Sequence, residues 1–276
     1  MKKAFILFLS LLAFAGCDEA IESTYTPKIV VQGFLYPGEG IDSVLLHYTT
    51  PYTKAYDDST YAIVGADVRV SVDGMEYQLQ PIPNTRGRYF LPKSSLTIEG
   101  GKTYSLTVRA GDLTVTAQTR VPQPISITNR ETAFPASRVL VLDTNDATTF
   151  NYTLTAGPVE AGRLYMLEVN ALDTSYGKVP TGPQGPPVDT NAHVRYSFIQ
   201  TAPNIKIYSR LFGWFGRNQM TFLALDSNWI DYKRAVGYGS QSFIPYQPSL
   251  NHVNGGYGVW GSAAKDTIEI FLQLKK

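Results

Sequence analysis

The sequence predicts an all-β protein of two successive sandwich-like domains with one short helix. Apolar and polar side chains alternate in many short segments, most clearly over residues 66–73, which is typical of a strand with one buried face. Asp-Gly and Gly-Asp pairs separate neighbouring segments and predict tight hairpins. The 18 tyrosines, 23 glycines and 17 prolines fit many short strands joined by turns.

The chain begins with the features of a secretory signal. Lys2 and Lys3 precede an apolar run over residues 4–15 that is too short to span a bilayer. Cys17, the only cysteine, directly follows the small residue Gly16, an arrangement that resembles a bacterial lipobox. We expect cleavage between Gly16 and Cys17 and acylation of Cys17. The alternative is an unmodified cysteine just after an ordinary secretory cleavage site.

The segment after the cleavage site is polar and acidic. Residues 17–27 show no hydrophobic period, so we expect the residues that follow the lipidated Cys17 in this segment to form a flexible tether. Several acyl chains, each contributing about 0.8 kcal/mol per buried methylene, would hold the protein at a membrane. No run of eighteen apolar residues follows position 17, so the lipid is the expected anchor.

The composition indicates which partners and which stabilising interactions are not expected. The formal net charge of +1 falls when Lys2 and Lys3 leave with the leader, and no lysine- or arginine-rich cluster remains. Nucleic acid is therefore excluded as an expected partner. With Cys17 acylated, no cysteine remains for a disulfide, and hydrophobic burial has to stabilise the fold.

The first expected domain covers residues 28–122 and resembles an immunoglobulin-like sandwich in strand number and spacing. No Cys-Trp-Cys pattern is present, so a transthyretin-like sandwich stays open. Asp73-Gly74 and Gly111-Asp112 predict two hairpins. Seven strands are expected, over residues 28–35, 42–48, 66–73, 75–79, 87–91, 104–110 and 113–117.

A polar, tyrosine-rich loop interrupts this domain at residues 49–62. Tyr52, Tyr56 and Tyr61 could present a rigid, amphipathic contact surface for a ligand or partner. The alternative, an ordinary long connection, is the interpretation we favour.

The second expected domain covers residues 123–276. Pro122 and Pro124 break the alternation and stop ladder hydrogen bonding, which places the boundary there. Strand patterns return around Phe150, after Tyr165 and from Ile268 onward. One helix is expected, capped by Asp226 or Ser227 and stopped by Gly237, with Trp229, Tyr232 and Val236 on one face. We expect residues 237–261 to be loop-rich.

The sequence offers no motif for catalysis, metal or cofactor. His47, His193 and His252 are far apart and lack metal-ligand spacing. Residues 256–261 satisfy GxGxxG, but no βαβ context follows. No GxSxG occurs, and Asp143, Asn145 and Asp146 lack the glycine and glutamate of a calcium loop. We predict no enzyme, no catalytic residue, no metal and no cofactor, with an unrecognised carboxylate pair left open.

An aromatic group in the second domain could stack against sugars or peptides. The competing interpretation places most of these rings in the core or under the helix. The group comprises Trp214, Trp229, Tyr246, Tyr257 and Trp260, and from it we take Trp214 and Trp260 as possible ligand or partner contacts.

The order of several motifs is similar to the Bacteroidetes lipoprotein family catalogued as domain of unknown function 4249. These motifs are the lipobox, KIVVQGFLYP, GGKTYSLTVRAG with a following TAQTRVP, LDSNWIDYKRA and NHVNGGYGVWG. The resemblance implies an outer-membrane lipoprotein, in a setting where such proteins accompany TonB-dependent transporters. Asp18 and Glu19, directly after the cysteine, resemble a surface-export signal and imply exposure at the cell surface. A passive spacer is the alternative for these two residues.

We therefore expect a non-catalytic binding or accessory lipoprotein with two rigid sandwiches. Its expected partners are the membrane, through the lipid, a TonB-dependent transporter, and a glycan or peptide ligand. A structural or adhesive surface module is the alternative, and a surface hydrolase with an unrecognised carboxylate site is less favoured.

Overall fold

The computed structural model describes residues 25–51, 54–55, 57–143, 150–180, 193–235 and 251–275. Strands dominate it, which confirms the all-β prediction. The first half contains β1 (Ile29–Leu35), β2 (Ile41–Tyr48), α2 (Asp58–Tyr61), β3 (Asp67–Val72), β4 (Met75–Gln78), β5 (Gln80–Pro81), β6 (Arg88–Leu91), β7 (Thr103–Ala110) and β8 (Leu113–Arg120). The second half contains β9 (Ser126–Ile127), β10 (Val139–Leu142), β11 (Tyr152–Gly157), β12 (Leu164–Ala171), β13 (Val194–Tyr196), β14 (Asn204–Ile207), η2 (Ser209–Leu211), β15 (Gly216–Leu225), α3 (Ser227–Ala235), β16 (Val253–Asn254) and β17 (Tyr257–Leu274).

The strands of the first half form a sandwich around one hydrophobic core. One layer has the order β1-β2-β6-β5, and the other has the order β16-β8-β7-β3-β4. Each of the seven expected segments contains a strand. Alternate side chains of both layers, among them Val31, Leu46, Val68 and Leu106, meet in the core. We call this unit the first sandwich.

Both hairpins predicted from turn residues are present. Val72 pairs with Met75 around Asp73-Gly74, and both turn residues have positive φ. Ala110 pairs with Leu113 around a turn that begins with Gly111 at φ 57°. Turns of this hand match the right-handed twist of the strands they join.

The strands of the second half enclose a separate core. β13-β12-β15-β17, with β10 added along β17, lies opposite a sheet with the order β14-β11-β9. Leu154, Leu167, Phe222 and Ile268 are among the buried residues between them. We call this unit the second sandwich.

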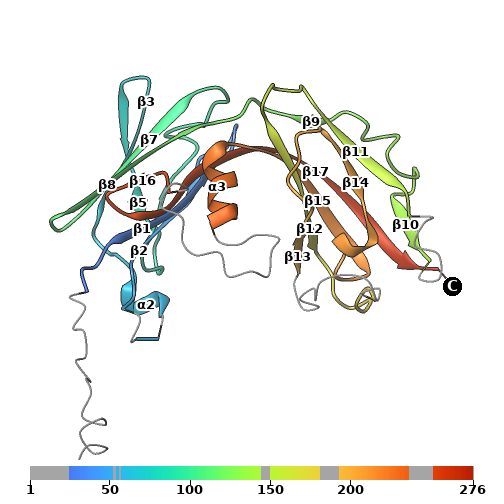
Figure 1. Ribbon diagram of the computed structural model, residues 1–276, viewed down its shortest axis with the longest axis horizontal. Coiled ribbons are helices and arrows are strands. Elements are labelled where there is room, and N and C mark those ends of the chain that lie inside the picture. Colours follow the sequence, from blue (N-terminus) through green and yellow to red (C-terminus); the bar gives the residue numbers. More distant parts are fainter. Residues whose placement is uncertain are drawn as a thin grey trace, which may run out of the picture.

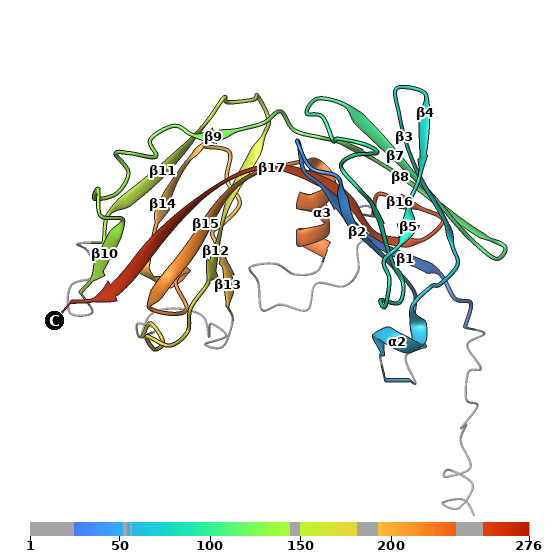
Figure 2. The ribbon, with the colours of Figure 1, turned by 180° about the vertical axis from the view of Figure 1, so that it is seen from behind.

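One long strand, β17, belongs to both sandwiches. Residues 257–262 pair in parallel with β1, and residues 263–272 pair antiparallel with β15. The strand therefore joins the β1-β2-β6-β5 layer of the first sandwich to the β13-β12-β15 layer of the second. Together they form one continuous nine-stranded sheet of the described residues. Figure 1 shows it as the red arc from one half to the other, and Figure 2 shows the same arc from behind.

The start of β17 corrects the expectation that residues 237–261 are loop-rich. Residues 257–261 are strand, and residues 236–250 lie outside the described residues. Gly258 and Gly261 lie within β17, whereas Gly255 has the positive φ of a turn residue between β16 and β17. A Cβ built on Gly258 would lie 1.9 Å from the carbonyl oxygen of Val31, so only glycine fits beside β1.

Along the chain, the residues change from the first hydrophobic core to the second between Val121 and Ile127. The chain later returns, because Val253 and Trp260 are buried in the first core. The first sandwich is therefore built from residues at both ends of the chain.

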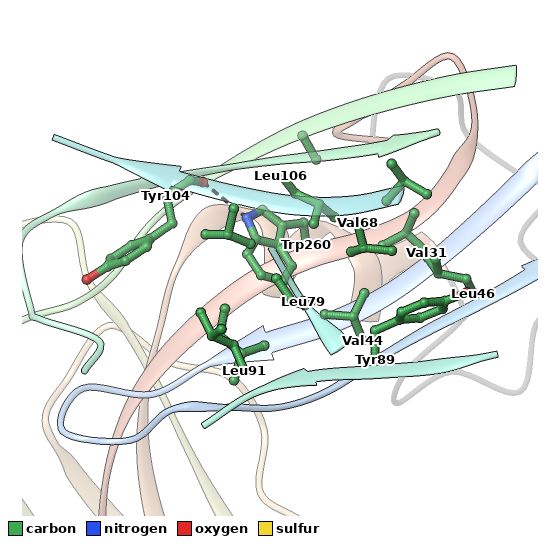
Figure 3. Close-up of a cluster of buried hydrophobic side chains, with 14 of the residues drawn as sticks. Val31, Val44, Leu46, Val68, Leu79, Tyr89, Leu91, Tyr104, Leu106 and Trp260 are labelled. Atoms are coloured by element: carbon green, nitrogen blue, oxygen red, sulfur yellow. Dashed lines mark hydrogen bonds between the residues drawn. The ribbon is translucent and has the colours of Figure 1, made fainter. Parts of the chain in front are cut away.

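Trp260 fills the centre of the first core. Its side chain is fully buried, and its indole nitrogen donates a hydrogen bond to the Tyr104 carbonyl at 3.1 Å. Figure 3 shows the ring surrounded by Val68, Leu79 and Leu106. Gly33 on β1 lies directly beside it, and a Cβ there would come within 2.8 Å of the indole carbons.

We expect Gly33→Ala to destabilise the protein by about 1–3 kcal/mol, because the added methyl group overpacks a rigid, buried ring. Urea unfolding measures the change. In a Trp260→Phe background the smaller ring leaves room, so the cost of Gly33→Ala should shrink. Equal costs in the two backgrounds would show that the Trp260 ring is not the obstacle.

Candidate functional site

The continuous nine-stranded sheet has one face that packs into the two cores and one face that lies outside them. On β17, Trp260 and Ile268 point into the first and second cores respectively, whereas Lys265 and Thr267 lie on the opposite face. The other strands follow the same alternation. The outer face therefore runs from the first sandwich to the second, and its side chains come from β1, β12, β13, β15 and β17.

Helix α3 covers part of this outer face. It lies between the two sandwiches beneath the arc of β17 in both views (Figures 1 and 2). Trp229 and Ile230 are buried against the sheet, as expected for an amphipathic helix, and Lys233 and Arg234 occupy its last turn. The small cluster between the helix and the sheet consists of Met166, Leu223, Leu225, Trp229, Ile230 and Ala263, with Phe34, Tyr36, Leu164, Tyr196 and Ile199 packed against it.

Asp226 fixes the start of α3. Its Oδ1 accepts a hydrogen bond from the Trp229 backbone nitrogen at 2.8 Å, which is an N-cap contact. Its Oδ2 accepts from Thr119 Oγ1 of β8, and Thr119 Oγ1 also lies 2.7 Å from Ser262 Oγ of β17. Burial raises the pKa of the Asp226 carboxyl, and these hydrogen bonds oppose the rise.

Asn228 adds a second link between α3 and the first sandwich. Its side-chain amide donates to the Gln118 carbonyl and, at 2.8 Å, to the Trp260 carbonyl. Gly261 has no side chain, and a Cβ there would lie 3.3 Å from the Trp229 backbone nitrogen. The first turn of α3 is therefore held tightly against β8 and β17.

A cleft of about 570 Å³ opens where α3, β1 and the outer face of the second sandwich meet. Its side chains come from both sandwiches and from the helix, so neither sandwich forms it alone. We call it the outer-face cleft. Its lining residues are Gln32, Phe34, Tyr36, Glu168, Tyr196, Gln219, Thr221, Leu223, Trp229, Tyr232, Lys233, Lys265 and Thr267.

The two lysines of the outer-face cleft lie over aromatic rings. Lys233 Nζ is 4.5 Å from the centre of the Tyr196 ring, and Lys265 Nζ is 3.9 Å from the centre of the Tyr36 ring. Lys265 Nζ also forms an ion pair with Glu39 at 2.9 Å. These contacts fix the positions of both ammonium groups.

Glu168 provides the carboxylate of the cleft. Burial raises the pKa of its carboxyl, while the charges of Lys233 and Lys265 and a hydrogen bond from the Tyr196 hydroxyl lower it. Burial also lowers the pKa of the Lys233 ammonium, and Glu168 opposes that change. The pKa of Tyr196 rises to about 12, through burial and the Glu168 charge, so its phenol stays protonated as a donor.

Aromatic rings form one wall of the cleft. The Phe34 ring centre is 4.3 Å from that of Trp229 and 6.4 Å from that of Tyr232. Tyr36 meets Trp229 edge-on at 6.0 Å. Burial raises the pKa of the Tyr36 and Tyr232 phenols. The wall thus combines apolar ring faces with protonated hydroxyl groups.

Of the contact residues expected from the sequence, Tyr61, Trp214 and Trp260 are among the described residues, and they lie in different parts of the structure. Trp260 is fully buried, so it is a core residue, as the competing interpretation holds. Trp214 lies beside Gly216, which pairs with the far end of β17, and it stacks on His193 at 5.9 Å with Lys178 over its ring. Tyr61 ends the short helix α2.

The remaining expected positions lie outside the described residues, namely Gly16, Cys17, Tyr52 and Tyr56. The lipid anchor and the rest of the tyrosine-rich loop stay predictions. Tyr61 is partly exposed in that loop, and its backbone N–H donates a hydrogen bond to the Asp57 carbonyl.

The sequence reasoning missed most residues of the outer-face cleft. Gln32, Glu168, Gln219 and Lys265 lie at the polar positions of alternating strands, which the pattern predicts to face water. The only sequence feature that could have indicated these residues is the recurrence of charged and amide side chains at the polar positions of these strands. Trp229 was placed in the aromatic group, and in the structure it lies on α3, where it is buried against the sheet and lines the cleft.

Within the described ranges, no group of three or more His, Cys, Asp or Glu side chains is arranged to hold a metal ion. The same residues include no helix with the length and apolar character needed to cross a membrane.

The profile of a protein family described as "Domain of unknown function (DUF4249)" matches residues 18–267. The chain belongs to this family. The match covers the first sandwich, the second sandwich up to Thr267 of β17, α3 and every residue that lines the outer-face cleft. A comparison with curated protein sequences gives no match.

Several solved structures are similar to this DUF4249 chain at low identity. The DIP-gamma IG1+IG2 structure is 8% identical with a TM-score of 0.21, and the alignment covers 91% of this chain and 99% of that one. The chicken CNTN1 FN1-FN3 domains are 13% identical with a TM-score of 0.26, covering 90% and 66%. Trypsin-activated alpha-2-macroglobulin from Escherichia coli is 11% identical with a TM-score of 0.22, covering 90% and 16%.

The buried Asp226 of this DUF4249 protein should make stability depend on pH. Because its pKa is higher in the folded than in the unfolded chain, the folded state binds the proton more tightly. Stability contributed by this proton is present at low pH and is lost as pH rises through the folded pKa. The quantity to compare is the free energy of unfolding of the wild type minus that of Asp226→Asn. We expect this difference to fall as the pH rises above about 4. The slope is at most about 1.4 kcal/mol per pH unit.

Urea unfolding at pH values between 4 and 8 measures this difference. Asp226→Asn keeps a side-chain oxygen that can cap Trp229, so the helix start should persist. A difference that stays constant, or rises with pH, would contradict the assignment of a raised pKa to Asp226.

Proposed function

We propose that this protein is a non-catalytic binding or accessory lipoprotein of the outer membrane whose ligand occupies the outer-face cleft. One observation carries the proposal: the cleft places two lysines, a half-buried carboxylate and a wall of aromatic rings together at the junction of the two sandwiches. Concave sites with aromatic walls and a few fixed polar groups are the usual form of ligand pockets.

The scaffold supports binding because the lining side chains stand on regular elements. β12, β15 and β17 form the floor, and α3 is held at its first turn by Asp226 and Asn228. Side chains that are already ordered lose little conformational entropy when a ligand arrives. A cleft of this kind can select a ligand without a large rearrangement of the chain.

The membrane anchor and the transporter partner rest on the sequence. The lipobox resemblance at Gly16-Cys17 supports acylation, and the acidic residues Asp18 and Glu19 support display at the cell surface. A TonB-dependent transporter is the proposed partner, to which the anchored protein would deliver or present its ligand. Tyr52, Tyr56, Tyr61 and Trp214 remain proposed partner contacts.

A structural or adhesive role is the second candidate, and the continuity of β17 favours it. A strand shared by both sandwiches resists bending between them, as a spacer requires. The two candidates differ in the cleft. A spacer tolerates loss of the cleft side chains, whereas a binding protein does not.

We expect Cys17→Ser to release the protein from the membrane. Without acyl chains, each contributing about 0.8 kcal/mol per buried methylene, the proposed anchor is lost. Cell fractionation gives the distribution, and the intact mass of the wild type shows whether acyl groups are present. Wild-type protein of unacylated mass, or a Cys17→Ser variant that stays with the membrane, would contradict the lipoprotein assignment.

We expect at least one small polar ligand to raise the melting temperature of the full mature chain, and Tyr232→Ala to remove that increase. A ligand at 100 times its Kd stabilises by about 2.7 kcal/mol, which shifts the melting temperature of a chain of this size by several degrees. Neutral saccharides, acidic saccharides and short peptides are the probes. If none of the three classes gives a shift that depends on Tyr232, the cleft is not a ligand site.

A further inference from the structure

We infer that the outer-face cleft binds a neutral, polyhydroxylated ring, namely a monosaccharide or disaccharide unit. This inference rests on the proposed function and names the ligand class of the same site. It follows from the charge balance, the hydrogen-bonding groups and the floor of the cleft.

The charges of the cleft are balanced within the protein. Lys265 is paired with Glu39 at 2.9 Å, and Lys233 lies near enough to Glu168 for each to shift the pKa of the other. The site therefore contains two positive and two negative groups. A strongly anionic or cationic ligand would have to break an existing pair to gain a new one, whereas a neutral ligand would not.

The polar groups of the cleft can both donate and accept hydrogen bonds. Thr221 and Thr267 are partners across the β15–β17 ladder with their hydroxyl oxygens 3.4 Å apart, and Gln219 lies two residues along the same face of β15. Gln32 contributes a second amide from β1. Hydroxyl and amide groups of this mixed character match the vicinal hydroxyls of a sugar, each of which donates and accepts.

The aromatic wall supplies the apolar contact that a sugar ring requires. Phe34, Trp229 and Tyr232 lie together at one side of the polar floor. Flat rings pack against the C–H face of a pyranose with little loss of side-chain entropy. A volume of about 570 Å³ lies within the usual range for small-ligand pockets.

The floor argues against an extended peptide. Peptides that bind sheets usually do so along an exposed edge, where main-chain groups are unpaired. Here β12 pairs with β13 and β15, and β15 pairs with β12 and β17. The main-chain groups of the floor are used in these ladders, so the cleft offers a ligand mainly side chains.

Isothermal titration of the full mature chain tests the inference. The neutral probes are maltose, cellobiose, lactose and N-acetylglucosamine; glucuronate and trialanine represent acidic sugars and peptides. We expect at least one neutral sugar to bind, and Thr221→Val and Gln219→Ala each to weaken that binding at least tenfold. Thr221→Val removes the hydroxyl at nearly constant volume, and Gln80→Ala on the exposed strand β5 is the control that leaves binding unchanged.

The outcomes separate the ligand class from the proposed function. If only glucuronate or trialanine binds, with the same loss in Gln219→Ala, the cleft is a ligand site and the neutral-sugar assignment is wrong. If no probe shows binding that depends on Gln219 or Thr221, the assignment and the proposed cleft function both fail. Circular dichroism and unfolding of each variant exclude loss of the fold as the cause.

Discussion

The pairing of β17 with both β1 and β15 is the constraint on which the rest of the structure depends. A single strand of 18 residues supplies one face to two cores, so the sandwiches share a sheet instead of meeting at a separate interface. Because side chains alternate along a strand, this arrangement forces the other face of β17 to lie outside both cores. α3 and the outer-face cleft occupy that face at the point where the strand passes between the sandwiches.

Local patterns predicted the hairpins and most strands, because each depends on neighbours in sequence. Asp73-Gly74 needs only two residues with positive φ between alternating strands, and α3 needs only a cap and an apolar face. The start of β17 was missed because its glycines resemble those of a loop. Gly258 is required by the carbonyl of Val31, more than two hundred residues earlier, and no local pattern reports that contact.

The cleft was hidden for a related reason. Lys265 and Glu168 appear in the sequence as ordinary exposed charges of alternating strands, whereas in the structure Glu168 is half-buried in a cleft lined also by α3 and β13. Trp260, the most conspicuous aromatic residue of its segment, is instead needed beside Gly33 in the first core. Residue type therefore indicated the chemistry available, whereas the position of each residue depended on pairings distant in sequence.

The placement of α3 links the stability of the protein to its proposed site. The helix is fastened at its first turn, where Asp226 and Asn228 bond to β8 and β17, and its later residues Tyr232 and Lys233 line the cleft. Burying the carboxyl of Asp226 is unfavourable by itself, and a fold that needed only stability could use an apolar contact there. Hydrogen bonds are directional, so this cluster fixes the orientation of the helix as well as its position. The cost is consistent with a helix whose far end has to hold Tyr232 and Lys233 at set distances from Phe34 and Tyr196.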